Sequence, residues 1–598
     1  MRIEDIQSPE FLKSLSTKEL QELSEQIRAF IIDNVSKTGG HLSSNLGVVE
    51  ITVALHYVFN SPYDKFIFDV GHQGYTHKIL TGRAKDFPTL RKKDGLGAFL
   101  KYSESPHDVW EAGHSSTALS AAAGFLEAKE SGENMGDIIA IVGDGSIQNG
   151  LSFEGLNYLG SQKHQKAIII INDNDMSISK NVGRLAKKFS KIRIKKSYSI
   201  FKKITPNFIH RLFRSVKIGF RSFIYGDNIF STLGYKYYGP IDGHSIPDLI
   251  KYFQFAKNCK HSVILHVKTS KGKGYPYSEY DDTGYWHGVK PFNIETGKPI
   301  SKPKNGLIPW GQGICNILLE VAKDKFFYVI TPAMIEGSRL QDFQSTYPKR
   351  LIDVGIAEEH AVVMAAAIAR NNVIPIVSIY STFMQRAYDQ ISHDVCRSNN
   401  HVIFLVDRAG LNGGDGSTHQ GIFDIAFLSH LPNIVITMPK DLSEAYNLIS
   451  FALEYKGPIV IRYSKSKTQL IAYKKEKITL GSWVEEKPIS DVNIITYGDI
   501  VNEFSYKLPN HIGLINARFI KPLDIDMLKK LANKRILVVE EVVKYGSLGA
   551  MILDANNKYD LNLKIETYGI DDIYLDSGTT PELRKELEID VDSIIKKL

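Results

Sequence analysis

Two stretches decide the fold: IIAIVGDG at Ile138–Gly145 and IIIINDND at Ile168–Asp175. Each is a run of apolar, mostly β-branched residues that ends in polar ones, which is typical of a buried parallel strand opening onto a ligand crevice. We therefore expect Asp144 and Asn174 to lie at the ends of neighbouring strands. Their oxygen atoms suit Mg²⁺, which often also binds phosphate oxygens. The glycines beside Asp144 allow backbone N–H groups to approach a phosphate.

The rest of the chain repeats this pattern. The segment Ser152–Leu159 has the apolar spacing of a crossover helix between the two strands. Strand-like runs recur along the sequence at helical intervals, which predicts parallel α/β sheets. Two stretches without clear periodicity divide the series, Lys298–Pro309 and Lys465–Gly481. We predict three consecutive doubly wound α/β domains, with bounds at residues 1–305, 306–478 and 479–598.

Composition is that of an ordinary globular protein, with 43% hydrophobic and 23% charged residues among 598. The first residues, MRIEDIQSPEF, lack a basic and apolar leader, and no stretch is apolar enough for a transmembrane helix. We therefore expect a cytoplasmic protein. Cys259, Cys315 and Cys396 are far apart in sequence, which favours three core thiols over a disulfide or a zinc site.

One segment carries the basic excess of the chain. Residues 184–221 contain thirteen Lys or Arg and no Asp or Glu, which is more than the whole net charge of +7. Apolar and aromatic residues alternate with these cations, so part of the segment can form amphipathic helices. A solvated or partner-facing insertion is the simpler interpretation, and contact with an anionic surface is the alternative.

Histidines gather in glycine-containing, loop-like sequences of the first predicted domain, at His41, His72 and His114. A single histidine of this kind is more often structural than catalytic, but three in similar settings favour a functional site. The hydroxyl residues that follow His114, beginning with Ser115, precede a helix-like run. They could cap that helix or hold an anion.

In the second predicted domain, Glu358 stands where a short apolar run meets a helix-like stretch. As a first-turn helix charge it would contribute about 0.3–1 kcal/mol. Held in an apolar cleft, its carboxyl would have a raised pKa and could donate a proton to a heterocycle nitrogen. The sequence leaves both interpretations open, and it makes the neighbouring Glu359 the candidate for the solvated side.

The same domain holds aromatic, cationic and acid–base candidates: Tyr380, Phe383, Arg386, Arg408, Asp415, His419 and Arg462. The two aromatic rings could stack on a flat ligand or belong to the core. The arginines follow strand-like runs or lie on polar loops, where a guanidinium can bind a phosphate or a carboxylate. The Gly-Asp-Gly around Asp415 has no matching strand-end Asn, so we do not interpret it as a metal site.

A series of motifs along nearly the full length resembles one known family. They include DVGHQGYTHKILTGR at Asp69–Arg83, GPIDGH at Gly239–His244, DVGIAEEHAV, IYSTFMQRAYDQISHDV and DRAGLNGGDGSTHQG. The chain is similar to the 1-deoxy-D-xylulose-5-phosphate synthases, which use thiamin diphosphate and belong to the transketolase-like superfamily. The resemblance implies a homodimer of three-domain chains, in which the first domain holds the diphosphate of the cofactor and the second its aminopyrimidine.

The resemblance also implies a cofactor site. Asp144 and Asn174 would bind Mg²⁺ through their side chains and Met176 through its carbonyl, while Glu358 would hydrogen-bond N1′ of the pyrimidine. The residues implied to contact thiamin diphosphate are His72, Gly113, His114, Ser115, Gly145, Ser146, Asn174, Tyr275, His287, Glu358 and Phe383. Asn45, at a position where the family often has a smaller residue, borders this region.

The reaction implied is the decarboxylating condensation of pyruvate with D-glyceraldehyde 3-phosphate to 1-deoxy-D-xylulose 5-phosphate, the first step of the non-mevalonate isoprenoid pathway. Its catalytic residues would be Glu358, His41, His72 and His419, and the substrate would contact Tyr380, Arg386, Arg408, Asp415 and Arg462. One alternative is a transketolase-type paralogue with a different donor. Another is a catalytically silent scaffold that docks through the basic segment. No nucleic acid partner is expected.

Overall fold

A computed structural model describes residues 2–162, 165–174, 229–281, 283–300 and 306–598. They form two compact units, of which the first comprises Met1–Leu90 and Ala98–Ile300. The second comprises Arg91–Gly97 and Ser301–Leu598. The predicted metal ligand Met176 and the basic segment 184–221 lie outside the described residues.

The first unit is built on a parallel sheet with the strand order β1-β2-β3-β5-β4. Its strands are β1 (Lys65–Phe68), β2 (Ile138–Gly143), β3 (Ala167–Asp173), β4 (Lys236–Asp242) and β5 (Val263–Lys268). The two deciding stretches are the adjacent strands β2 and β3, with Gly143 opposite Asn172. Their apolar residues are buried, as expected for a sheet with helices on both faces.

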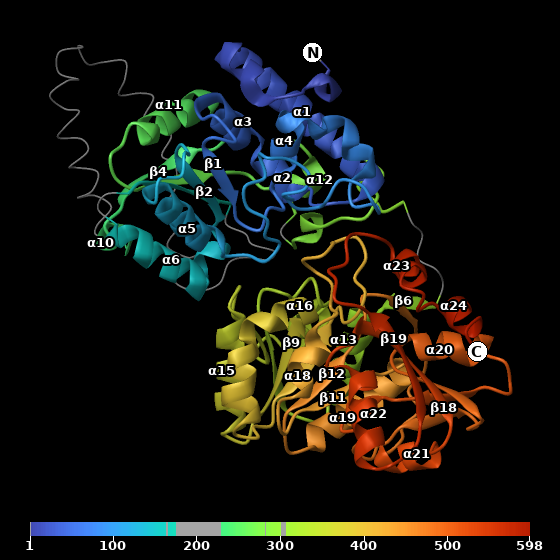
Figure 1. Cartoon of the computed structure of the whole chain (residues 1–598). Helices are drawn as coiled ribbons and strands as arrows, with labels where there is room; N and C mark the ends of the chain where they lie inside the picture. The colour runs from blue at the N-terminus through green and yellow to red at the C-terminus, as the bar shows by residue number, and fades with distance from the viewer. Residues whose placement is uncertain (1, 163–164, 175–228, 282, 301–305) are drawn as a thin grey trace, which may run out of the picture. The chain divides into compact units, whose positions relative to one another are not determined.

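Helices cover the two faces of this sheet (Figure 1). On one face lie α5 (Ala118–Glu130) and α6 (Gly150–Ser161), the latter being the predicted crossover helix, and on the other α3 (Val49–Val58) and α11 (Ile246–Lys257). The long α1 (Thr17–Thr38) begins with a capping box, in which Ser16 and Glu19 exchange hydrogen bonds. Shorter helices are α2 (Ser43–Gly47), α4 (Tyr75–Lys78), α10 (Ile229–Thr232) and α12 (Pro276–Glu279).

The second unit contains a seven-stranded sheet with the order β17-β11-β12-β10-β9-β7-β8. Its strands are β7 (Phe327–Thr331), β8 (Leu351–Asp353), β9 (Ile374–Tyr380), β10 (Ile403–Asp407), β11 (Val435–Thr437), β12 (Ile459–Arg462) and β17 (Phe519–Lys521). Only β17 runs antiparallel to its neighbour within this sheet. The helices of this part are α13 (Trp310–Val321), α14 (Gln341–Thr346), α15 (Glu358–Ala369), α16 (Ser381–Met384), α17 (Tyr388–Gln390), α18 (Asp424–Ser429) and α19 (Leu442–Glu454).

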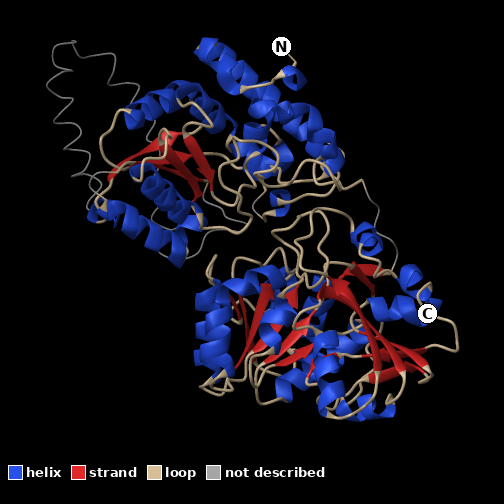
Figure 2. Cartoon of the chain, in the orientation of Figure 1, coloured by secondary structure: helices blue, strands red, loops and turns tan. Residues whose placement is uncertain are grey.

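A third sheet follows, with the order β14-β16-β15-β18-β19. Figure 2 draws its strands, like those of the other sheets, as red arrows. Its strands are β14 (Val484–Lys487), β15 (Val492–Thr496), β16 (Gly513–Asn516), β18 (Arg535–Val543) and β19 (Lys564–Ile570), and a separate pair joins β6 (Leu307–Pro309) to β13 (Lys467–Gln469). The helices are α20 (Ile500–Lys507), α21 (Ile525–Lys530), α22 (Leu548–Lys558), α23 (Thr580–Glu586) and α24 (Val591–Ile595).

The second and third sheets share one hydrophobic core, which contains Leu448 as well as Ile552. Strand β17 belongs to the last third of the chain but pairs with β11 at the edge of the second sheet. The expected α/β class with three successive sheets is confirmed. The predicted domain bounds stay a prediction, because the second and third sheets lie in one compact unit.

In the part of the chain that the structure describes, no helix combines the length and apolar character that a membrane crossing requires. All three cysteines are free thiols; Cys315 and Cys396 are buried, as predicted for core thiols, whereas Cys259 is only half-buried, so the prediction of a core position is wrong for this residue.

Candidate active site

Carboxylates meet at the carboxyl ends of β2 and β3. Asp144 is buried; its Oδ1 accepts the N–H of Gly145 at 3.0 Å, and its Oδ2 has no hydrogen-bond partner. Burial and the negative charge of Asp173 raise the pKa of Asp144 well above its usual range, which Lys271 partly opposes. Asn174 follows directly after β3. A buried oxygen without a donor beside a second carboxylate fits a divalent cation.

The loop after β2 is tightly fixed. The carbonyl oxygen of Ser146 accepts hydrogen bonds from the hydroxyls of Ser116 at 3.0 Å and Ser152 at 2.8 Å. Ser146 begins the short 3-10 helix that follows Gly145. The loop that was predicted to contact a diphosphate is therefore held to two neighbouring segments of the same unit.

The segment Gly113–Ser116 has an unusual backbone. Gly113 has a φ of 103° and donates its N–H to Val70 at 2.8 Å, and Ser116 has a φ of 77°. The backbone N–H groups of Ser116 and Ala118 donate to the carboxylate of Asp69 at 2.7 and 3.3 Å. Asp69, which the sequence did not single out, therefore caps α5, while His114 and Ser115 lie just before this cap.

Three of the predicted histidines come together in the first unit. The ring centroids of His41 and His72 are 5.6 Å apart, those of His41 and His287 5.8 Å, and those of His72 and His287 5.2 Å. Phe99 packs against His41 at 5.2 Å. Burial, together with the positive charge of Lys271, lowers the pKa of His72 to about 4 and that of His287 well below its usual range. Both rings are therefore neutral near pH 7.

Asn45 joins the loops that carry two of these histidines. Its amide nitrogen donates to the carbonyl oxygens of His41 at 2.7 Å and His72 at 2.8 Å, and its Oδ1 accepts the N–H of Tyr75 at 2.9 Å. The side chain is fully buried. The larger residue at this position therefore acts as a brace between the two loops.

Tyr275 lies in an aromatic cluster beside His287. Its hydroxyl donates to the carbonyl oxygen of Ile294 at 2.9 Å, and its ring packs against Trp286 and Phe292 at centroid distances of 5.2 and 5.7 Å. Trp286 directly precedes His287 in chain order. The structure thus anchors Tyr275 to the segment that carries this histidine.

In the second unit, Glu358 is the first residue of α15, and its side chain is only 4% exposed. Burial raises the pKa of Glu358, while the guanidinium of Arg386, 3.5 Å away, opposes the shift. Glu358 is thus both a first-turn glutamate and a buried carboxyl with a raised pKa, while proton donation to a heterocycle nitrogen stays a prediction. Arg386, predicted to bind substrate, is placed beside this carboxyl.

Aromatic rings and cations surround Asp415. Tyr380 stacks on Phe383 at 5.3 Å, and the ring of His419 meets Phe383 edge-on at 5.5 Å. The guanidinium of Arg408 lies 4.0 Å from the centroid of Tyr380 and 3.6 Å from the carboxylate of Asp415. The predicted residues Tyr380, Phe383, Arg408, Asp415 and His419 thus form one group.

Two further cations complete this group and were missed in the sequence. Lys465 lies 2.6 Å from Asp415, and Arg91 forms an ion pair with the same carboxylate. Although burial acts to raise it, the pKa of Asp415 is held well below its usual range by Lys465, Arg91 and Arg408. No local pattern could reveal Arg91, which is separated from Asp415 by 324 positions.

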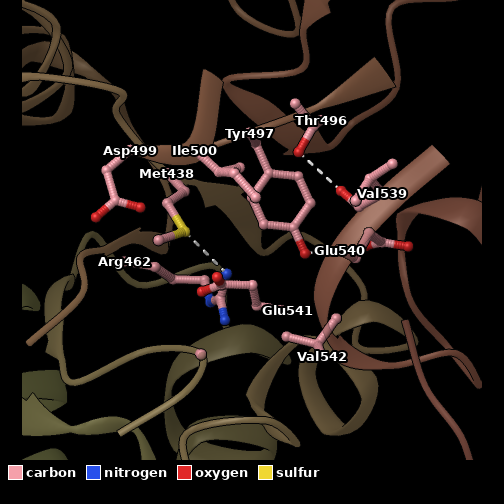
Figure 3. A pocket seen from close by; sticks show the side chains of 11 residues that line it. Met438, Arg462, Thr496, Tyr497, Asp499, Ile500, Val539, Glu540, Glu541 and Val542 are labelled. Carbon is pink, nitrogen blue, oxygen red and sulfur yellow. Dashed lines mark hydrogen bonds between the residues drawn. The ribbon is translucent and has the colours of Figure 1, made fainter. Parts of the chain in front are cut away.

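Arg462 is placed apart from this group. Its guanidinium binds the carboxylate of Asp424 through Nε at 2.7 Å and Nη2 at 2.9 Å, and Nη1 contacts the sulfur of Met438 at 3.2 Å. It lines a pocket with Tyr497 and Glu540 (Figure 3), where the hydroxyl of Tyr497 donates to Glu540 at 2.9 Å. Arg462, which was predicted to bind a phosphate, is thus already paired with the buried carboxylate of Asp424.

Comparisons with known proteins give consistent matches along the chain. Residues 3–269 match the family model described as 1-deoxy-D-xylulose-5-phosphate synthase. Residues 309–469 match the transketolase pyrimidine binding domain, and residues 481–594 the transketolase C-terminal domain.

Curated relatives described as 1-deoxy-D-xylulose-5-phosphate synthase cover the full chain. The one from Bacillus licheniformis is 42% identical over 621 residues, and the one from Macrococcus caseolyticus 44% over 619, each alignment covering 100% of this chain and 98% of the relative. Among solved structures, a transketolase from Campylobacter jejuni is 17% identical with a TM-score of 0.42, covering 98% of this chain and 99% of that one. The assignment therefore rests on the sequence matches.

Proposed function

The chain belongs to the family of 1-deoxy-D-xylulose-5-phosphate synthases, and from this premise we propose roles for the residue groups of its two units. The protein is an enzyme of the transketolase type, a transferase that joins pyruvate to D-glyceraldehyde 3-phosphate with loss of CO₂. Its cofactor is thiamin diphosphate. When bound, this cofactor supplies a nucleophilic ring carbon that attacks the 2-oxo acid and accepts the electrons that decarboxylation releases.

We propose that Asp144, Asn174 and the carbonyl of Met176 hold a Mg²⁺ ion that carries the diphosphate of the cofactor. The support is the buried Oδ2 of Asp144, which has no hydrogen-bond donor. Gly145, Ser146 and the segment Gly113–Ser115 contact the diphosphate oxygens in this proposal. The fixed loop after β2 favours this role, because its position needs no adjustment on binding.

The buried Glu358 is the observation that carries the assignment of the acid. Because burial raises its pKa, its carboxyl keeps a proton at a higher pH than an exposed glutamate does. It can therefore donate that proton to N1′ of the pyrimidine. Arg386 tunes this carboxyl through its contact at 3.5 Å, and Phe383 packs against the pyrimidine ring.

The histidine cluster is assigned to the donor. His41, His72 and His287 would surround the 2-oxo acid and provide both donor and acceptor nitrogens, since His72 and His287 are neutral near pH 7. His41 and His72 move protons, and Tyr275 holds the segment of His287 in place. The close ring distances within this cluster support a shared role.

The group around Asp415 is assigned to the acceptor. Arg91, Arg408 and Lys465 place three positive charges around one carboxylate, which leaves an excess suited to a phosphate ester. The ionised Asp415 then accepts a hydrogen bond from the acceptor hydroxyl, and His419 moves a proton to its aldehyde oxygen, with Tyr380 beside them. Arg462 keeps its predicted phosphate role only when its pair with Asp424 opens.

A homodimer is part of the proposal. Helix α15 exposes apolar residues on its outer side, among them Val363 at 43%, and α6 exposes Phe153 at 46% and Tyr158 at 44%. A helix that is apolar on all sides is ordinarily buried, so a second copy of the chain is the natural cover. Sedimentation analysis should give twice the mass of the chain, and Val363→Glu should shift it toward the monomer.

Product analysis tests the reaction. The purified protein, given pyruvate, D-glyceraldehyde 3-phosphate, Mg²⁺ and thiamin diphosphate, should release one CO₂ per molecule of 1-deoxy-D-xylulose 5-phosphate formed. Two-carbon transfer from a ketose phosphate without CO₂ would instead identify a transketolase-type paralogue. The cytoplasmic location also stays a prediction, which cell fractionation can check.

For residues 184–221 a solvated or partner-facing insertion stays the simpler interpretation, and contact with an anionic surface, from their charge alone, stays the alternative. Deleting this segment should abolish any association of the protein with vesicles that contain anionic lipid. Unchanged association after the deletion would remove the docking role.

A further inference from the structure

A diagonal row of polar side chains crosses the otherwise apolar sheet of the first unit. Tyr237 of β4 lies opposite Ile264 of β5, and Ile264 is two residues before His266 in the same strand. His266 in turn lies opposite Ile171, two residues before Asp173. Residues two apart in a strand point to the same face, so the three polar side chains share one face of β4, β5 and β3.

These side chains are connected. The hydroxyl of Tyr237 hydrogen-bonds Nδ1 of His266, and Nε2 of His266 lies 2.6 Å from Oδ2 of Asp173. The ammonium of Lys268 is 3.5 Å from the same carboxylate oxygen. The imidazole tautomer with its proton on Nε2 satisfies both bonds, because it donates to the carboxylate and accepts from the hydroxyl.

Burying this row of polar side chains lowers the free energy gained on folding. His266 is 0% and Asp173 1% exposed, and the other buried residues of their two strands are apolar except Asn172. A buried polar or ionic pair is often no more stable than an apolar pair of the same volume. Stability alone therefore does not explain why this face carries them.

The inner end of the row reaches the proposed metal site. Asp173 is the last residue of β3 and directly precedes Asn174. Asp144 directly follows β2, the strand that pairs with β3. Asp144 holds the carboxylate oxygen without a hydrogen-bond partner. Metal sites commonly have such an outer layer, in which hydrogen-bonded partners fix the groups around the ion.

We propose that Tyr237 and His266 are positioning residues, which hold the carboxylate of Asp173 beside Asp144 so that the oxygen atoms of both side chains are in place for the divalent cation. This inference rests on the proposed Mg²⁺ site and deepens it. His266 orients the carboxylate, and Tyr237 orients His266. Neither residue touches the cofactor or the substrate.

The test measures how Mg²⁺ supports the binding of thiamin diphosphate to the full chain, by isothermal titration calorimetry. His266→Leu should raise the Mg²⁺ concentration for half-saturation about 10- to 100-fold, the usual effect of losing such a partner. Tyr237→Phe removes one oxygen atom and should raise it about two- to tenfold. His266→Gln, which keeps a donor near the position of Nε2, should recover part of the loss.

Tyr238→Phe is the matched control. Tyr238 is the next residue of β4, faces the opposite side of the sheet and packs against Phe255 at 4.8 Å. Its variant should have the half-saturation of the unmodified protein. At saturating Mg²⁺, kcat of Tyr237→Phe should return to the unmodified value, because the residue acts on binding of the ion.

The outcomes distinguish a wrong metal site from a wrong positioning role. An unmodified protein that binds thiamin diphosphate equally well without Mg²⁺ would refute the proposed metal site. If the unmodified protein needs Mg²⁺ but folded Tyr237→Phe and His266→Gln variants keep its half-saturation, the positioning role is wrong. A drop in melting temperature with unchanged half-saturation would identify a purely structural row.

Discussion

Replacing Glu358 by glutamine removes the one proton that the buried carboxyl can give while it keeps the shape of the side chain. Because this side chain is 4% exposed, solvent has little access to replace the lost acid. Proton transfer by a positioned group contributes about 10²- to 10⁴-fold, so CO₂ release from pyruvate should fall by that factor. The affinity for thiamin diphosphate should fall about tenfold or less, since the amide still offers a hydrogen bond.

The assay is CO₂ release from pyruvate, together with exchange of the proton at C2 of the thiazolium ring followed by NMR. Both rates should fall in parallel in the Glu358→Gln variant. Glu359→Gln is the matched control, because Glu359 neighbours Glu358 in α15 but is only half-buried. Its charge adds less than burial does to the raised pKa of Glu358, so both rates should change far less than in Glu358→Gln. A Glu358→Gln variant with the exchange rate of the unmodified protein would refute the assignment.

Three further changes test other parts of the structure. Lys465→Met removes one of the cations around Asp415 and should raise KM for D-glyceraldehyde 3-phosphate roughly tenfold or more while KM for pyruvate stays constant, as steady-state kinetics would reveal. Burial raises the pKa of Asp407 from 3.8 to about 6, so its folded form binds the proton more tightly and stability falls as pH rises between these values. Asp407→Asn should remove that decline, and denaturant midpoints from pH 4 to pH 7 would test it. Asn45→Ala loses three buried hydrogen bonds and should cost about 3 kcal/mol of unfolding free energy, with an unchanged denaturant midpoint as the contrary result.

Strands buried on both faces were predictable because their residues are apolar without interruption. This holds for β2 and β3, whose ends also predicted Asp144 and Asn174. Strand β19 carries half-exposed residues at the edge of its sheet, so its pattern is weak. Strand β17 has three residues, and its partner β11 lies some eighty positions earlier, a pairing that no local pattern encodes.

In the candidate site, too, residues in local motifs were predictable and their partners distant in sequence were not. Glycine-containing loops predicted His41 and His72, the family resemblance implied His287, and the structure brings these three rings together. Partners distant in sequence were not predictable. Asp424 lies 38 residues before Arg462, and that single contact changes the charge this arginine offers to a ligand.

Strand β17 limits where the chain can be truncated. Ending the chain at residue 478 would remove β17 and leave the edge of β11 and part of the shared core uncovered. An uncovered strand edge next to apolar surface pairs readily with other chains, so such a fragment should aggregate. The two transketolase-type regions thus form one compact unit, although each has a sheet of its own.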